Sequence, residues 1–242
     1  MDRVTRAVGA ALAGCAVLGV SACGADEDTD TPAPPPAPPA LGAAVPAAPG
    51  VGVSIPDSAL LAAGLLGTTD LPSDFTALPP RTGSSVASGA EVAPTTPAEC
   101  AKILVPLAAQ YPGSTAAAQA TYAGPDFSSI DIDAAAYPDA ALAPAFASFQ
   151  ALVSRCASYS GADGTGIHIE YRAGALPQPP AGDASTAFQV NTSSEGLTLY
   201  SAVSLVQVGN TLVQIAVTAP SAVEPGVLTD VTAAQVRKLR GE

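Results

Sequence analysis

Apolar and polar residues alternate with a period of two along several stretches of the chain, a pattern that predicts strands with one buried face. The alternation is clearest in residues 128–136, where Ile130 and Ile132 alternate with Asp131 and Asp133. We expect the isoleucines to face the core and the two aspartates to lie on the solvated side of an edge strand. Similar patterns predict further strands at residues 114–122, 166–172, 184–191, 196–208 and 212–218.

Apolar residues at three-to-four-residue spacing predict helices. The strongest such pattern covers residues 140–156, and its apolar positions are Leu142, Phe146, Phe149, Leu152, Val153 and Cys156. A second helix should begin at Thr96-Pro97-Ala98-Glu99, whose first and last residues can form a capping box, and Pro106 should kink or restart it. A short helix at 59–66 and a closing helix near 224–240 complete the set.

Gly209-Asn210 lies between two predicted strands and matches a two-residue hairpin turn, because both residue types tolerate positive φ. Hairpins of this kind, rather than βαβ crossovers, are the connections that the element order favours. The sequence therefore predicts an α+β fold: a mainly antiparallel twisted sheet with two to three packed helices and one disulfide. We expect this globular domain to cover residues 56–242.

Residues 1–22 have the pattern of a bacterial export signal. Arg3 and Arg6 give a basic start, and an uncharged apolar stretch follows that is too short for a comfortable membrane span. Val20-Ser21-Ala22-Cys23 resembles the lipobox of bacterial lipoproteins, which implies cleavage before Cys23 and a diacylglyceryl group on its sulfur. Leu12-Ala13-Gly14-Cys15 also matches the pattern, although cleavage there would leave an unusually short apolar stretch. We prefer Cys23, with the mature protein held by lipid on the extracytoplasmic side of the cell membrane.

Residues 23–55 predict a disordered linker. An acidic stretch comes first, and residues 31–50 are almost entirely Pro, Ala and Gly, a composition that favours extended polyproline II and builds no core. Such a tract would act as a spacer between membrane and domain. The alternative is a ligand for a proline-binding partner.

Charge narrows the classes of partner. The 242 residues include 9 Lys and Arg against 21 Asp and Glu, a net charge of −12. Loss of residues 1–22 would remove Asp2, Arg3 and Arg6 and leave −13. An acidic chain lacks the cationic surface that nucleic acids require, and anionic lipid surfaces would repel it. These charges favour an anchor through lipid, and we expect a monomer that binds no nucleic acid.

Four cysteines are present, and two remain once Cys15 leaves with the signal and Cys23 takes the lipid. Cys100 and Cys156 are then a pair in an exported, oxidising setting, so we predict a disulfide between them. A metal site is the alternative, but the chain has no CxxC motif and His168 is its single histidine.

Candidate catalytic groups are few. No G-x-S-x-G elbow is present, and His168 is the single imidazole base, on a strand face that we expect to be exposed. Asp131 and Asp133 share a strand face and are the other candidates, for acid–base work or for cation binding. The glycine-rich stretch at 161–166 lacks the lysine and the helix of a phosphate-binding loop. We therefore expect no catalytic residues, no metal and no cofactor.

Three features together resemble a known family. They are Leu71-Pro72-Ser73-Asp74-Phe75 near the domain start, Pro97-Ala98-Glu99-Cys100 opening a helix, and Cys156 ending a second helix ahead of the Val208-Gly209-Asn210 hairpin. This combination is similar to the extracellular sensor domain of mycobacterial PknH-type serine/threonine kinases and to its stand-alone actinobacterial lipoprotein relatives.

The resemblance implies an antiparallel sheet with packed helices, stabilised by disulfides, and a cleft that binds a small ligand. The kinase sensor has two disulfides, whereas this chain has one available pair. The chain has no kinase domain, so signalling by phosphorylation does not carry over, and no ligand-binding residue does either.

Three hypotheses of function follow. The leading one is a non-catalytic, lipid-anchored binding or sensor-like module of the cell envelope, with a small or lipidic ligand in a cleft between helices and sheet. The alternative is a structural or protein-interaction lipoprotein, which displays an exposed apolar patch to an envelope protein instead. The third is an enzyme that uses His168 or the pair of Asp131 and Asp133.

Overall fold

The computed structural model describes residues 37–51, 55, 57–79 and 94–242. Two compact units divide the chain, residues 1–33 and 34–242, and every described residue belongs to the second. The predicted signal peptide, Cys15 and Cys23 lie outside the described residues. Among the helices that the structure describes, none combines the length and the apolar character that a membrane crossing requires.

One antiparallel sheet forms the centre of this unit. Within the described residues it has nine strands in the order β1-β3-β4-β9-β8-β7-β6-β5-β2. Their bounds are β1 (Thr76–Ala77), β2 (Thr95–Thr96), β3 (Ala116–Ala123), β4 (Ser129–Ala136), β5 (Ser158–Ala162), β6 (His168–Ala175), β7 (Ala184–Ser194), β8 (Leu197–Val208) and β9 (Thr211–Ala219). Every predicted strand is present, as is the hairpin at Gly209-Asn210, so the α+β prediction is confirmed.

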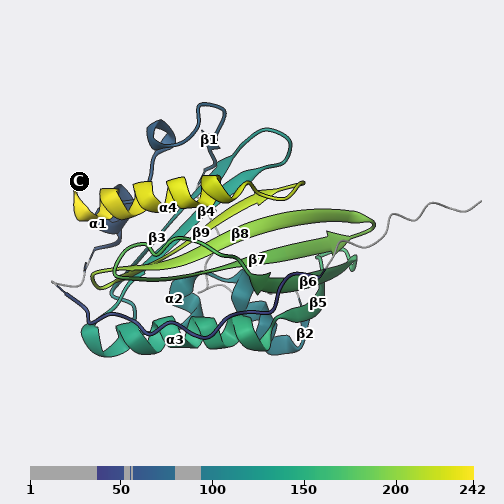
Figure 1. The fold of residues 1–242 in the computed structure, drawn as a ribbon, viewed down its shortest axis with the longest axis horizontal. Helices are drawn as coiled ribbons and strands as arrows, with labels where there is room; N and C mark the ends of the chain where they lie inside the picture. Colours follow the sequence, from purple (N-terminus) through teal and green to yellow (C-terminus); the bar gives the residue numbers. More distant parts are fainter. Residues whose placement is uncertain (1–36, 52–54, 56, 80–93) are drawn as a thin grey trace, which may run out of the picture. The chain divides into compact units, whose positions relative to one another are not determined.

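Helices cover both faces of the sheet (Figure 1). On one face lie α1 (Ser58–Ala63) and α4 (Pro225–Arg240), and on the other lie α2 (Leu107–Gln110) and α3 (Asp139–Arg155). Two 3₁₀ helices, η1 (Thr68–Asp70) and η2 (Ala98–Leu104), complete the set. The helix predicted from Thr96 is the 3₁₀ helix η2 instead, with Pro97 at its N-cap, and Pro106 restarts the chain as α2.

Side chains that alternate along the central strands build two cores. Ile130 and Ile132 of β4 pack towards α1 and α4, together with Leu228 of that last helix. On the opposite face, Phe146 of α3 packs with Leu205 of β8. This alternation is the physical consequence of a sheet that is buried on both faces.

The aspartates of β4 are a correction to the sequence analysis. We expected both to lie on a solvated edge face, but β4 lies between β3 and β9, away from the edges of the sheet. The backbone N–H of Leu107, at the start of α2, donates to Asp133 Oδ2 over 2.6 Å. The other carboxylate oxygen of Asp133 is shut off from solvent and has no hydrogen-bond partner in the described part of the chain.

The predicted disulfide is confirmed. It joins Cys100 of η2 to Cys156 at the end of α3, with the two Cα atoms 5.6 Å apart. Both cysteines are fully buried, next to Tyr159 and Tyr171, whose rings stack with centroids 4.5 Å apart. The bond therefore fixes η2 against the third helix and against the β5–β6 end of the sheet.

Residues 37–51, which we call the strap, are a second correction. We predicted a free linker through residue 55, but the strap lies against the domain and runs along α3 (Figure 1). Pro39 accepts a hydrogen bond from the N–H of Ala175 at the end of β6. Extended Pro- and Ala-rich backbone is thus part of the folded unit here, because groups far away in the sequence satisfy its polar atoms.

Candidate functional site

A groove with a volume of about 930 Å³ lies between the strap and the sheet. Strap residues 41–48 and α3 line one side of it. The loop at 175–183, the first residues of β7, and parts of β8 and α4 line the remainder. Ligand sites in proteins are commonly concave spaces of this size, so this groove is the candidate functional site.

Two glutamines hold the strap in place. Gln150 of α3 accepts from the N–H of Val45 over 2.8 Å and donates to the carbonyl of the same residue over 2.9 Å. Gln207 of β8 binds Ala48 in the same two-way manner, over 2.9 and 3.0 Å. A primary amide offers a peptide group one donor and one acceptor, so each glutamine replaces a missing strand neighbour.

The opposite wall is the loop at 175–183, which side-chain contacts also fix. Gln178 donates to the carbonyl of Pro225 and accepts from the hydroxyl of Thr229, which joins the loop to the start of α4. Asp183 accepts from the N–H of Gly209 over 2.6 Å and from Arg240 over 2.9 Å. Both walls of the groove are therefore attached to the fold at several points.

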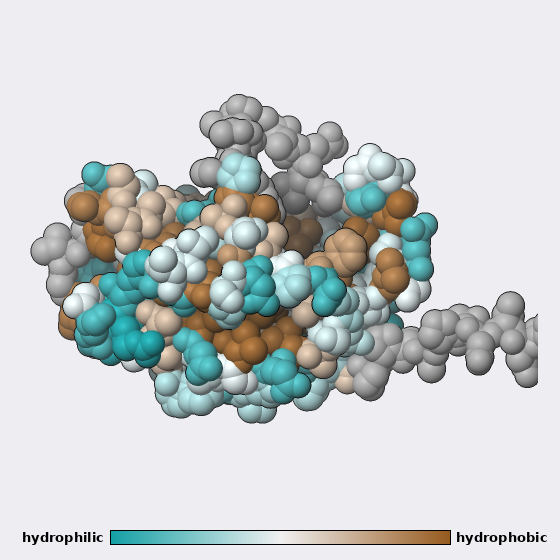
Figure 2. Space-filling view, turned by 90° about the horizontal axis from the view of Figure 1, so that it is seen from above, coloured by the Kyte–Doolittle hydropathy of each residue, from teal (hydrophilic) through white to brown (hydrophobic). Residues whose placement is uncertain are grey.

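The lining of the groove is apolar with scattered hydroxyl and amide groups. Phe149, Val153 and Phe188 contribute apolar surface from α3 and β7. Asp183 is the single ionisable residue among the described lining residues, and Arg240 neutralises it. Apolar residues also gather between polar ones on the face that carries α4 (Figure 2). Burying a charge without a partner is costly, so this lining favours an uncharged, amphipathic ligand.

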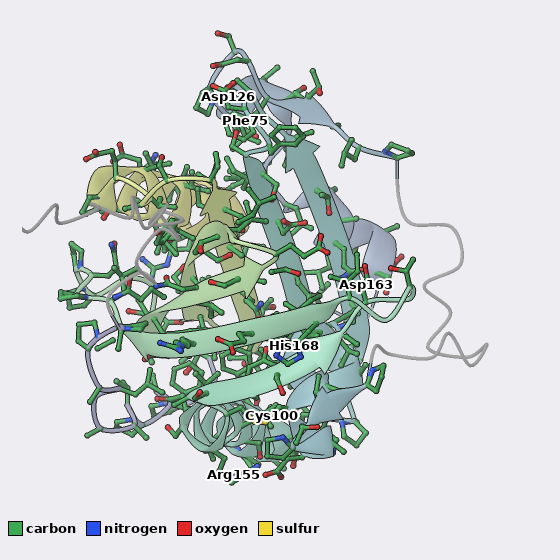
Figure 3. All side chains as sticks on the ribbon, turned by 90° about the vertical axis from the view of Figure 1, so that its right-hand side faces the viewer. Phe75, Cys100, Asp126, Arg155, Asp163 and His168 are labelled. Carbon is green, nitrogen blue, oxygen red and sulfur yellow. A yellow bond between two sulfur atoms is a disulfide. The ribbon has the colours of Figure 1, made fainter. Side chains whose placement is uncertain are left out.

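His168, the single candidate imidazole base, lies outside the groove. Its side chain is 67% exposed, and Nε2 is 3.9 Å from Glu170 of the same strand, which also lies 3.5 Å from Arg172. Figure 3 shows His168 well separated from Asp126 on the β3–β4 connection. The hydroxyl of Ser194 donates to the backbone carbonyl of His168 over 2.7 Å, and the arrangement is that of an exposed strand face.

Asp131 and Asp133 share a strand face but do not act as a pair. Asp131 accepts from the hydroxyl of Ser129 over 3.0 Å, whereas Asp133 accepts from Leu107. Burial raises the pKa of Asp133 to about 6, and the hydrogen bond from Leu107 opposes this shift. Within the described ranges, no group of three or more His, Cys, Asp or Glu side chains is placed to hold a metal ion.

The glycine-rich stretch at 161–166 covers the last two residues of β5 and most of the connection to β6. Asp163 Oδ1 accepts from the hydroxyl of Thr165 and from the N–H groups of Thr165 and Ile167, and these hydrogen bonds lower the pKa of its carboxyl. Its own aspartate thus occupies the amides that a phosphate would need. This stretch is a hairpin connection rather than an anion site.

The residues that matter most here were missed from the sequence. Gln150 lies on the apolar stripe of α3 between Phe149 and Val153, and Gln207 interrupts the apolar run of β8. Polar residues at buried positions were the available signal, because a buried amide must find hydrogen-bond partners. The sequence does not show which backbone segment supplies them.

No family model and no curated protein matches the chain. Among solved structures, the extracellular domain of PknH from Mycobacterium tuberculosis is similar in fold, with a TM-score of 0.57 and 15% sequence identity. The match covers 74% of this chain and 94% of that domain. At this identity the likeness shows the fold alone. The match confirms, for the fold, the resemblance to the extracellular domain of PknH-type kinases that the sequence indicates.

Proposed function

We propose that this chain is a non-catalytic, extracytoplasmic binding module of the sensor type, anchored by lipid on Cys23 in an actinobacterial cell envelope. The observation that carries the proposal is the uncharged groove of about 930 Å³ between strap and sheet. A fold shared with the extracellular domain of PknH supports the extracytoplasmic location. The ligand is small or lipidic and carries no net charge, since Asp183 already has its partner in Arg240.

Filling the groove tests its role in binding. Thr186 lies on β7 within the groove, and Thr192 lies on the same strand face outside it. We expect Thr186→Trp to weaken binding of the uncharged apolar dye Nile red at least tenfold, and Thr192→Trp to leave it unchanged. Native mass spectrometry of the purified protein tests the same site through co-purified lipid. Equal dye binding by both variants would remove the groove from the proposal.

The anchor needs a separate measurement. Intact mass of the protein from membrane and medium fractions should show a chain that begins at Cys23 with a diacylglyceryl increment. Cys15→Ser should leave this mass unchanged, whereas Cys23→Ser should release the protein from the membrane. An unmodified chain in the medium would contradict lipid anchoring.

The alternative function, a protein-interaction lipoprotein, has its own support. Large apolar side chains are exposed at the end of the sheet where β3 meets β4 and β7 meets β8, namely Phe127 at 92% and Leu197 at 76%. Binding of an envelope protein that Phe127→Ser and Leu197→Ser abolish, with the groove variants unaffected, would favour this alternative.

A further inference from the structure

The first residues of β7 leave one strand edge unpaired inside the groove. The two-residue turn at Glu195-Gly196 makes Ser194 and Leu197 a hydrogen-bonded pair, so even-numbered residues of β7 direct their N–H and C=O groups towards β8. Odd-numbered residues direct theirs towards β6. That strand ends at Ala175, opposite Phe188. From Ala184 to Ala187, β7 therefore pairs with β8 on one side and has no neighbouring strand on the other among the described residues.

Ser185 and Ala187 are therefore the residues whose backbone faces the open side. Both line the groove and both are partly accessible. Among the described residues, neither backbone N–H has a hydrogen-bond acceptor. The loop that follows β6 does not take the place of a strand here, because its contacts are with α4, with Gln207 and with the Ser185 hydroxyl.

The dimensions of this open edge match an extended peptide. Four residues of β7, Ala184 to Ala187, lie along it, which corresponds to about 13 Å of strand at 3.3 Å per residue. A neighbouring strand would lie about 4.8 Å from the edge, in the space between β7 and the strap. Unpaired edges of this kind take up extended peptides by strand addition, with affinity from the main chain and selectivity from alternate side chains.

The strap indicates which peptide chemistry the groove accepts. Its residues 41–48 are Leu, Gly, Ala, Val and Pro, and the domain holds them through backbone atoms at Val45 and Ala48. The same domain wall thus already binds one extended, uncharged segment with small side chains. The lining offers no free charge to pair with Lys, Arg, Asp or Glu of a second segment.

We propose that the groove binds a short, extended, uncharged peptide segment of a partner polypeptide as an added strand beside Ser185 and Ala187. Alternate side chains of the peptide lie against Phe149 and Val153 on one face and against the loop at 175–183 on the other. This inference rests on the proposed function only in taking the groove as the ligand site. For the ligand itself it names a polypeptide segment in place of a small or lipidic molecule.

Amide NMR of the purified ¹⁵N-labelled protein tests it with a defined probe, the end-blocked hexapeptide acetyl-Thr-Ala-Val-Ala-Thr-Ala-amide. We expect titration to shift the amides of Ser185 and Ala187 and to slow their hydrogen exchange. A fully N-methylated form of the peptide, which lacks every N–H, should bind at least tenfold more weakly. A peptide with Lys in place of both Thr residues should bind less as well.

A protein variant gives the matched control. Ala187→Pro removes the outward N–H without removing a hydrogen bond to β8, and it should weaken peptide binding at least tenfold, whereas Ala187→Ser should not. If Ala187→Pro does not fold, the N-methylated peptide decides the question on the unaltered protein. Nile red or lipid binding without peptide binding would overturn this inference and leave the proposed function standing. If the protein binds neither Nile red, nor lipid, nor the peptide, both this inference and the proposed function are overturned.

Discussion

Three buried glutamines hold irregular backbone in this molecule, and each does so with both atoms of its amide. Gln150 and Gln207 bind the strap, and Gln235 of α4 binds the end of α1 through the N–H of Leu66 and the carbonyl of Gly64. An amide satisfies a peptide group without introducing charge, so no ion has to be desolvated. At the residue scale this is how segments without a strand partner become part of the fold.

Asp133 should make stability depend on pH. Its pKa of about 6 in the folded protein lies above the ordinary value of 3.8, so the folded state binds the proton more tightly than the unfolded state does. Its contribution is therefore fully present below pH 4 and is lost as the pH rises through 6, at a cost of about 3 kcal/mol by pH 7. Urea unfolding at pH 5 and pH 7 should show about 1.4 kcal/mol of this change, because the remainder is lost below pH 5.

Asp133→Asn should remove most of that pH dependence and raise stability at pH 7. An asparagine oxygen still accepts from Leu107, and nothing has to ionise. Asp131→Asn, on the same strand and face, is the control. It should leave the difference in the free energy of unfolding between pH 5 and pH 7 unchanged. If the free energy of unfolding of the unaltered protein is the same at pH 5 and pH 7, the role given to Asp133 is wrong.

Gly182 is required by its backbone conformation and by its surroundings. Its φ of +61° lies in the left-handed region, and a Cβ there would collide with the carbonyl oxygen of Gln207. Gly182→Ala should therefore lower the free energy of unfolding by about 2 kcal/mol or more. Gly164→Ala is the matched control, because no heavy atom lies within 4 Å of its Cβ position. It should change stability by less than about 0.5 kcal/mol in the same denaturation experiment.

At the scale of elements, the strap depends on side chains distant in sequence. Gln207→Leu removes its hydrogen bonds to Ala48 and to Gly209, and the expected loss of stability is about 2 kcal/mol. Hydrogen exchange and limited proteolysis should accelerate at residues 41–50. Gln235→Leu should instead loosen residues 64–66 and leave the strap protected. Equal protection of the strap in both variants would mean that Gln207 does not hold it.

The disulfide closes a loop between two cysteines that are 56 residues apart in the chain. Replacing both Cys100 and Cys156 with alanine should lower stability by about 4 kcal/mol on the chain-entropy model. Exchange protection should fall first in η2, since this bond fixes that helix against α3. A loss below about 1 kcal/mol would show that packing with Tyr159 and Tyr171 alone suffices.

Long periodic elements were predictable because burial of one face imposes a period on the sequence. The long strands β3, β4, β8 and β9, and the helices α3 and α4, were predicted within a few residues. The strap was not, since a Pro- and Ala-rich segment has the same composition whether free or bound. Its partners lie 105 and 159 residues further along the chain, so no local pattern indicates them. The groove was missed for the same reason.

For the whole molecule, the proposed lipid at Cys23 and the strap together set how far the domain extends from the membrane. A linker over residues 23–55 would span up to about 115 Å, whereas the residues between Cys23 and the strap span at most about 50 Å. Energy transfer from a membrane dye to a label on the domain should report the shorter range. The double variant Gln150→Leu with Gln207→Leu should increase the distance between the membrane dye and the label. An unchanged distance would contradict a role of these glutamines in shortening the linker.

That difference gives the two glutamines a role in placement as well as in folding. A linker of half the length confines the domain to a thinner layer above the bilayer. The local concentration of the domain around a membrane-bound partner rises accordingly. Any event that separates the strap from Gln150 and Gln207 would lengthen the linker and open the groove at the same time. Height above the membrane and access to the site would then change together.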